Sequence, residues 1–130
     1  MIDSKLYKLL WCLRFLFFNI RQRKFKIGYL GRPLFICGTS NIFLESGVGI
    51  FPAARLECLN TGTIHIGKNS RFGHNLFFST TSSEITVGEN CIFSSNVYAG
   101  TQRYNFNSQR VSVNWFSEVS ESPIKIGNNC

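Results

Sequence analysis

The chain has 130 residues, and its 14 Lys and Arg outnumber its 7 Asp and Glu, which gives a formal net charge of +7 at pH 7. This length allows one domain at most. The five cysteines include neither a Cys-x-x-Cys pair nor an even-numbered framework, so we expect free thiols in a reducing, cytoplasmic compartment. No small-residue cleavage site follows the apolar N-terminal run, so the sequence does not predict a cleavable signal peptide.

The formal charge belongs entirely to residues 1–33, which carry eight Lys and Arg against one Asp, whereas residues 34–130 are balanced. Residues 9–20 are apolar but fewer than the ~20 that a membrane span needs. We expect a helix over residues 4–22 and a linker up to residue 33. A basic helix rich in Trp and Phe suits an anionic membrane surface, and it equally suits a cap over the following domain or a contact with a neighbouring subunit. Nucleic-acid binding is disfavoured, because the basic residues are few and no reading motif accompanies them.

The tripeptide Gly-Arg-Pro at residues 31–33 predicts the junction between this helix and a second region, residues 34–130. We expect the first strand at residues 34–36 and a corner at Pro52 and Ala53.

From residue 64 to residue 100 the sequence repeats a unit of six residues. Each unit has a large apolar residue first, a small residue second and a small or aliphatic residue fifth. The fourth position is Asn in four successive units, at Asn69, Asn75, Asn90 and Asn96. A period of six does not fit an amphipathic helix, whose apolar positions recur every three to four residues. It predicts a short strand followed by a tight corner, and three such units close one coil of a β-helix.

Each position in the unit has a physical reason. Asn belongs at the corner, because a left-handed backbone conformation is cheap only for Gly, Asn and Asp. The first and fifth residues point inward, so Cys91 and Cys130 in the fifth position are expected to be buried. The expected inward set is Leu44, Ile50, Leu56, Ile66, Phe72, Phe78, Val87, Phe93, Ala99 and Ile126, and the expected outward apolar set is Phe77, Ile92 and Tyr98.

A longer spacing supports the same coil. The motif Ile-x-(Ile/Val)-Gly begins at Ile64, Ile85 and Ile124, and a relaxed copy begins at Ile42. The intervals from Ile42 to Ile64 and from Ile64 to Ile85 are nearly equal, and each fits one coil of three units with small corner insertions. The interval from Ile85 to Ile124 is almost twice as long, so it is either two coils plus three residues or one coil that carries a long loop. Residues 101–123 depart from the repeat, and an insertion of this length is usually either functional or disordered. The aromatic residues within it favour a loop that folds against another surface.

Residues 66–97, with the restart at 124–129, resemble the left-handed β-helix acyltransferases built on hexapeptide repeats. Within that family they most resemble the bacterial O-acetyltransferases of surface-polysaccharide synthesis, and they are also similar to maltose and colanic-acid acetyltransferases. The resemblance covers roughly residues 34–130. It implies an all-β fold, a left-handed parallel β-helix preceded here by an N-terminal α-helix. It further implies acetyl-CoA as co-substrate, a saccharide hydroxyl as acceptor and a homotrimer with clefts between subunits.

Acyl transfer needs a base for the hydroxyl proton. The resemblance places a His on the loop after a Val-x-Ala strand, but here the loop after residues 97–99 contains none, and Tyr104 lies near that position. His74, in a position of the unit that is expected to face solvent beside corner Asn75, is the first candidate base, because His ordinarily titrates close to working pH. Tyr104 is the second. His65, mid-strand, is expected to face solvent, and the sequence offers no three-His zinc set.

Arg103, Asn105 and Trp115, in or beside the inserted loop, are the candidate substrate-binding residues. The sequence ends five residues into a new unit, so we expect a β-helix truncated at its C-terminal end. Two functions stay open. One is an acetyl-CoA-dependent saccharide O-acetyltransferase, cytoplasmic or peripheral on the inner face of the cell membrane. The other is a non-catalytic membrane-surface interaction or scaffold protein derived from such an enzyme.

Overall fold

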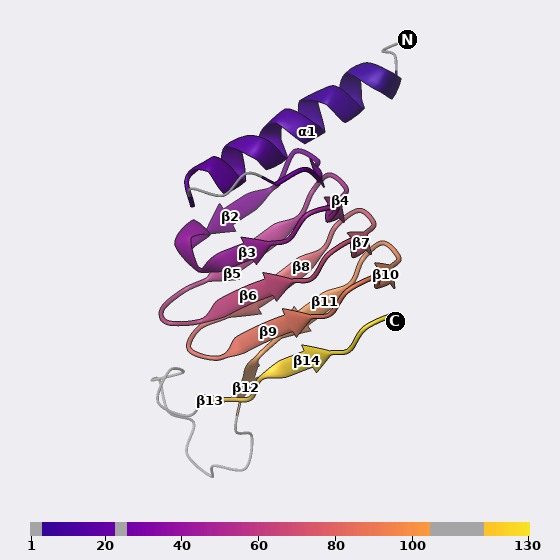
Figure 1. Cartoon of the computed structure of the whole chain (residues 1–130). Coiled ribbons are helices and arrows are strands. Elements are labelled where there is room, and N and C mark those ends of the chain that lie inside the picture. Colours follow the sequence, from indigo (N-terminus) through magenta and orange to yellow (C-terminus); the bar gives the residue numbers. More distant parts are fainter. Residues whose placement is uncertain (1–3, 23–25, 105–118) are drawn as a thin grey trace.

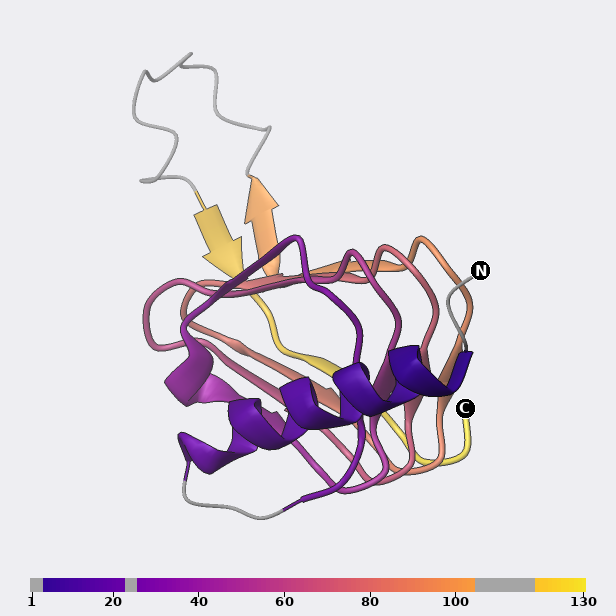
Figure 2. The ribbon, with the colours of Figure 1, turned by 90° about the horizontal axis from the view of Figure 1, so that it is seen from above.

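The computed structural model describes residues 4–22, 26–104 and 119–130. In it the helix α1 (Ser4–Ile20) lies across one end of a stack of parallel strands (Figure 1). Viewed from the α1 end, the chain runs anticlockwise around this stack as it recedes from the viewer, so the coil is left-handed (Figure 2). The predicted fold class, a left-handed parallel β-helix preceded by an α-helix, is confirmed.

The stack is a prism with three faces of four parallel strands each. Successive strands on one face come from successive coils, and all of them pair in parallel. Face A consists of β1 (Tyr29–Leu30), β4 (Gly49–Ile50), β7 (Arg71–Phe72) and β10 (Ile92–Phe93). Face B consists of β2 (Phe35–Cys37), β5 (Arg55–Cys58), β8 (Phe77–Thr80) and β11 (Tyr98–Gly100). Face C consists of β3 (Ile42–Leu44), preceded by the short helix η1 (Thr39–Asn41), then β6 (Thr63–Ile66), β9 (Glu84–Val87) and β14 (Ile124–Ile126).

The predicted inward residues form the core of the prism. Seven of them are buried: Leu44, Ile50, Leu56, Ile66, Phe72, Phe78 and Val87. The other three belong to the fourth coil and are partly buried against this core: Phe93, Ala99 and Ile126. Cys91 is buried as expected. The expectation for Cys130 is wrong, since it is exposed where no further strand covers it.

The corners also follow the prediction. Asn69, Asn75, Asn90 and Asn96 have φ angles of 60°, 60°, 58° and 63°, the left-handed region. In the preceding coils the equivalent corners are Gly47 and Ala53, with φ angles of 79° and 71°. The backbone conformation of Ala53 is unfavourable, because the left-handed region costs a residue other than Gly, Asn or Asp ~1–2 kcal/mol.

The long interval between Ile85 and Ile124 is one coil with an insertion. Ile124 of β14 pairs with Ile85 of β9 and not with an intervening strand. The chain leaves the prism after β11 and forms an antiparallel pair, β12 (Gln102–Tyr104) with β13 (Val119–Glu121), which projects from the prism (Figure 2). The Ser122 N–H donates to the Thr101 carbonyl (3.1 Å), which closes the base of the insertion.

The prism begins earlier than expected. β1 precedes the predicted first strand and pairs with β4, so the β-helix starts inside the segment 1–33 that the sequence assigned to helix and linker. The Gly-Arg-Pro tripeptide is therefore a corner between β1 and β2. β1 has only two residues, which are too few to show the six-residue repeat, and the sequence pattern therefore did not reveal this strand.

α1 covers the first coil, so the capping interpretation of the N-terminal helix is observed. Phe15 is fully buried in the core cluster. A Cβ atom on Gly28 would lie 2.6 Å from Cζ of Phe15 and 2.5 Å from the Val48 carbonyl oxygen, so only Gly fits between helix and prism at this point. Gln22 Nε2 donates to the carbonyls of Thr39 (2.8 Å) and Ile42 (2.6 Å), which fixes the C-terminal end of the helix on the same coil.

Candidate active site at the corner between faces A and B

His74 lies at an exposed corner between β7 and β8, as the repeat predicts. Its position is fixed by backbone contacts to the next coil: the His74 N–H donates to Ser95 Oγ (3.2 Å) and the Asn96 N–H donates to the His74 carbonyl (2.8 Å). Next to it, Asn75 Nδ2 donates to Asn96 Oδ1 (2.9 Å). On the other side, the Asn75 N–H donates to the Pro52 carbonyl of the preceding coil (3.3 Å), so the corner is held from both sides and gives the imidazole a rigid support.

An aromatic row connects His74 with α1. The His74 ring meets the Phe51 ring edge-on, with centroids 5.2 Å apart, and Phe51 in turn contacts Trp11 at 5.5 Å. Trp11 contacts Tyr7 at 6.4 Å, one turn earlier in the helix. These are ordinary distances for stabilising aromatic pairs. The row orients the imidazole from the side of α1.

Beside this row lies a hollow of about 350 Å³ lined by Lys8, Trp11, Tyr29, Gly49, Phe51 and Arg71, here called the corner hollow. It exists because an outward column on face A lacks one side chain. Tyr29, Gly49 and Arg71 are in register on β1, β4 and β7, and the middle one is Gly. A Cβ atom on Gly49 would meet nothing closer than Arg71 Cγ at 3.6 Å, so this Gly leaves open space.

The corner hollow combines cations with aromatic surfaces. Lys8 and Arg71 are exposed, while Trp11, Tyr29 and Phe51 supply ring faces. Such a lining can hold a phosphate by charge and a sugar or a base by stacking. His74 does not line the hollow itself. It is joined to it through Phe51 and lies three residues after Arg71.

The second His belongs to a charged cluster on face C. Glu45 accepts a hydrogen bond from Lys26 Nζ at 2.8 Å, and its other oxygen lies 3.3 Å from His65 Nε2. The hydrogen bond from Lys26 is the main reason that the pKa of Glu45 lies below its ordinary value. His65 faces outward as predicted, but it has a carboxylate partner, which the sequence analysis did not foresee. The signal was present, since Glu45 and His65 are separated by nearly the same interval as successive Ile-x-(Ile/Val)-Gly motifs.

The remaining candidates lie on the insertion. Arg103 is exposed in the middle of β12, and Tyr104 ends that strand with its backbone opposite Val119. Asn105 and Trp115 lie outside the described residues. β12 follows the C-terminal end of β11 on face B, whereas His74 precedes the start of β8 on the same face. Within one chain the structure therefore does not bring His74 and the insertion together.

Across residues 4–22, 26–104 and 119–130, no group of three or more His, Cys, Asp or Glu could hold a metal ion. In the same part of the chain no helix is long and apolar enough to cross a membrane. In comparisons with family models, curated proteins and solved structures, the chain matches none of them.

Proposed function

We propose that this protein transfers an acetyl group from acetyl-CoA to a saccharide hydroxyl, with His74 as the general base. The observation that carries the proposal is the exposed imidazole of His74 on a rigid corner, in contact with the wall of a cationic and aromatic hollow. The left-handed β-helix supports it further, because the acyltransferases that the sequence resembles share this architecture.

In the proposed reaction, the imidazole of His74 takes the proton of the acceptor hydroxyl as its oxygen attacks the thioester carbonyl. The carbon–sulfur bond then breaks, the CoA sulfur leaves with the electron pair, and the imidazolium returns the proton to it. Lys8 and Arg71 would hold phosphates of CoA, and Trp11, Tyr29 and Phe51 would stack against the adenine or the sugar ring.

We also propose that the active form is a homotrimer. His74 and the insertion with Arg103 and Tyr104 lie at opposite ends of face B in one chain, so a substrate that meets both must lie between two subunits. Face B carries an outward column of Phe35, Arg55, Phe77 and Tyr98 in register. The Arg55 guanidinium lies 4.5 Å above the Phe77 ring, and Phe77 and Tyr98 have centroids 5.0 Å apart, so this column is an ordered surface suited to a subunit contact.

The test measures thiol release from acetyl-CoA in the presence of saccharide acceptors, alongside sedimentation velocity. We expect His74→Ala to lower turnover by about 10²–10⁴-fold, the usual contribution of a general base, while the fold persists because the side chain is exposed. Tyr104→Phe tests the second candidate base. His65→Ala is the control, since it removes the other imidazole of the chain, which lies on face C.

Gly49→Val probes the corner hollow separately, because it fills the gap between Tyr29 and Arg71 without a backbone clash. We expect it to raise KM for acetyl-CoA with a smaller effect on kcat. Unchanged turnover in His74→Ala would remove His74 from the mechanism. No thiol release from a folded trimer with any saccharide would reject acetyl transfer and favour the non-catalytic scaffold.

A further inference from the structure

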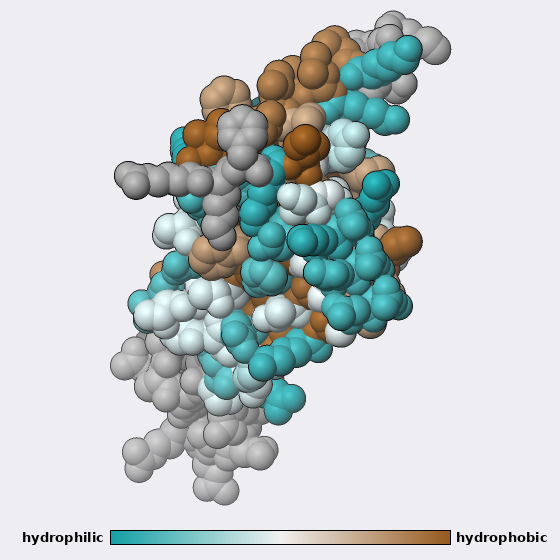
Figure 3. Space-filling model, viewed as in Figure 1, coloured by the Kyte–Doolittle hydropathy of each residue, from teal (hydrophilic) through white to brown (hydrophobic). Residues whose placement is uncertain are grey.

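The outward face of α1 is apolar along its whole length. Its inward face packs on the first coil through Phe15, Trp11 and Phe18, yet the opposite side carries a second apolar stripe. The stripe follows spacings of four and three residues, and its members are exposed: Leu6, Leu10, Leu13, Phe17 and Ile20, with Leu9 beside them. Phe17 is 70% exposed. Figure 3 shows this hydrophobic surface along the helix at the top of the molecule. A helix that is apolar on both sides is ordinarily covered on both sides.

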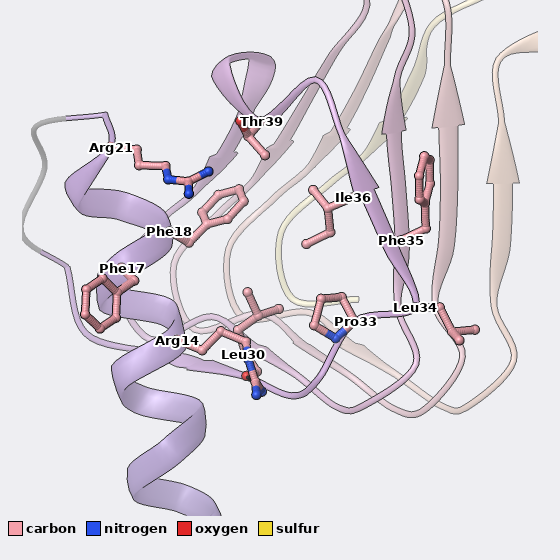
Figure 4. A pocket seen from close by; sticks show the side chains of 10 residues that line it. All are labelled: Arg14, Phe17, Phe18, Arg21, Leu30, Pro33, Leu34, Phe35, Ile36 and Thr39. Carbon is pink, nitrogen blue, oxygen red and sulfur yellow. Dashed lines mark hydrogen bonds between the residues drawn. The ribbon is translucent and has the colours of Figure 1, made fainter.

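A groove of about 560 Å³ adjoins the stripe, between α1 and the segment that leads into β2 (Figure 4). One wall is formed by Phe17 and Phe18 of α1, and the other by Leu34, Phe35 and Ile36. Leu34 is 69% exposed, so the apolar surface continues from the helix onto the rim of the prism. We call the stripe and this groove together the end surface.

The charges around the end surface are of one sign. Arg14 of α1 and Arg21, which directly follows the helix, both line the groove. Arg14 Nη1 donates to the Leu30 carbonyl (3.0 Å), which holds its guanidinium at the groove. Between residues 4 and 44 the sequence contains eight Lys and Arg, of which Lys26 is paired with Glu45 and Lys8 lines the corner hollow, and no Asp or Glu. Any partner must therefore accept apolar side chains and several positive charges at once.

We propose that the end surface docks on an anionic phospholipid bilayer, with α1 in the plane of the interface. The stripe enters the boundary between headgroups and acyl chains, as amphipathic interfacial helices do, and Arg14 and Arg21 contact lipid phosphates. A second copy of the chain fits this surface less well. Pairing two stripes would bring two sets of cations together with no acidic residue of the helix to meet them. The proposal does not depend on acetyl transfer.

The test is co-sedimentation of the full chain with vesicles of phosphatidylcholine, with and without phosphatidylglycerol. We expect binding to the anionic vesicles that weakens as salt is raised. Phe17→Ser should reduce the partition coefficient at least about fivefold, and Ile92→Ser is its control, because Ile92 is an equally exposed apolar residue (78%) on face A, away from α1.

Arg21→Glu tests the charge, since reversing one cation near an anionic surface should weaken binding about tenfold or more. Lys68→Glu is its control, because it makes the same charge change at an exposed corner away from the end surface. Circular dichroism establishes that each variant is folded. Equal effects of variants and controls would overturn the proposal, and so would equal binding to neutral and anionic vesicles. No vesicle binding, with an oligomer that Phe17→Ser dissociates, would assign the surface to a second copy instead.

Discussion

The upper half of the prism, β1 to β6 beneath α1, and the lower half, β7 to β11 with β14, are stabilised by different means. In the upper half the left-handed corners are Gly38, Gly47 and Ala53, and Phe15 of α1 closes the core. The lower half begins and continues with Asn corners, while its last inward side chains, such as Phe93, are only partly buried. Long-range packing therefore maintains the upper half, and residues local to the repeat maintain the lower half.

The largest expected difference between the halves comes from their terminal aromatic residues. Phe15→Ala should lower the free energy of unfolding by about 3–5 kcal/mol, because it opens a cavity beneath α1. Phe93→Ala should cost about 1–2 kcal/mol, since Phe93 is partly exposed and loses mainly its stacking on Phe72 (centroids 4.6 Å apart). Urea unfolding followed by circular dichroism measures both. Equal losses would show that the helix does not cover the core more tightly than the last coil does.

Equivalent corners of the two halves can be compared by exchanging their residues. Ala53 and Asn75 occupy the same corner in successive coils, with φ angles of 71° and 60°. Ala53→Asn should raise stability by about 1 kcal/mol, because Asn accepts the left-handed conformation that strains Ala. Asn75→Ala should lower it by about 1–2 kcal/mol, since it also loses the hydrogen bond to Asn96. Each change corresponds to a shift of a few degrees in Tm by calorimetry. A destabilised Ala53→Asn variant would contradict the strain at this corner.

The smallest effect concerns the contact between the N-terminal linker and face C. Lys26 holds the pKa of Glu45 below its ordinary value of 4.5, so the folded state gains stability above that pH and loses it as pH falls through the lowered value. Glu45→Gln should therefore lower stability at pH 7 by up to about 1 kcal/mol, the usual range for a partly exposed pair.

The difference between wild type and Glu45→Gln should shrink as pH falls through the lowered pKa of Glu45, since the wild-type carboxyl then becomes protonated as well. Thermal midpoints of both proteins between pH 7 and pH 3 test this. A difference that stays constant across the range would mean that the ion pair with Lys26 contributes nothing to it.

The two halves of the prism also differ in how much of their structure the sequence predicts. Apart from the burial of Cys130, the lower half was predicted residue by residue. Asn75, Asn90 and Phe78, for example, each occupy a position whose backbone angle or burial follows from a period of six. β1 was missed, since Tyr29 and Leu30 are placed by pairing with β4 and by the helix above them. The long interval before Ile124 could not be resolved either, because both alternatives keep this residue in register with the repeat.

Only part of the candidate site could be predicted from the sequence. The exposure of His74 was predicted from its place beside Asn75. Its contact with Phe51 was not predicted, because the aromatic row that includes both rings is assembled from two coils and from Trp11 of α1. The corner hollow depends on Gly49 facing outward between Tyr29 and Arg71, and only the register of three strands reveals that gap. Sequence periodicity locates single positions, whereas a site arises where several columns meet.

The closed base of the insertion has a practical consequence for protein engineering. The Thr101 carbonyl accepts the Ser122 N–H, and the Glu121 carboxylate accepts hydrogen bonds from Thr101 Oγ1 (3.2 Å) and from the Ser82 N–H (2.8 Å). The chain thus departs and returns at one fastened point, and β14 resumes in register on β9 after the insertion. The base between β12 and β13 is therefore a defined point for engineering, where an affinity tag or a fluorescent reporter could be inserted without altering the pitch of the coil.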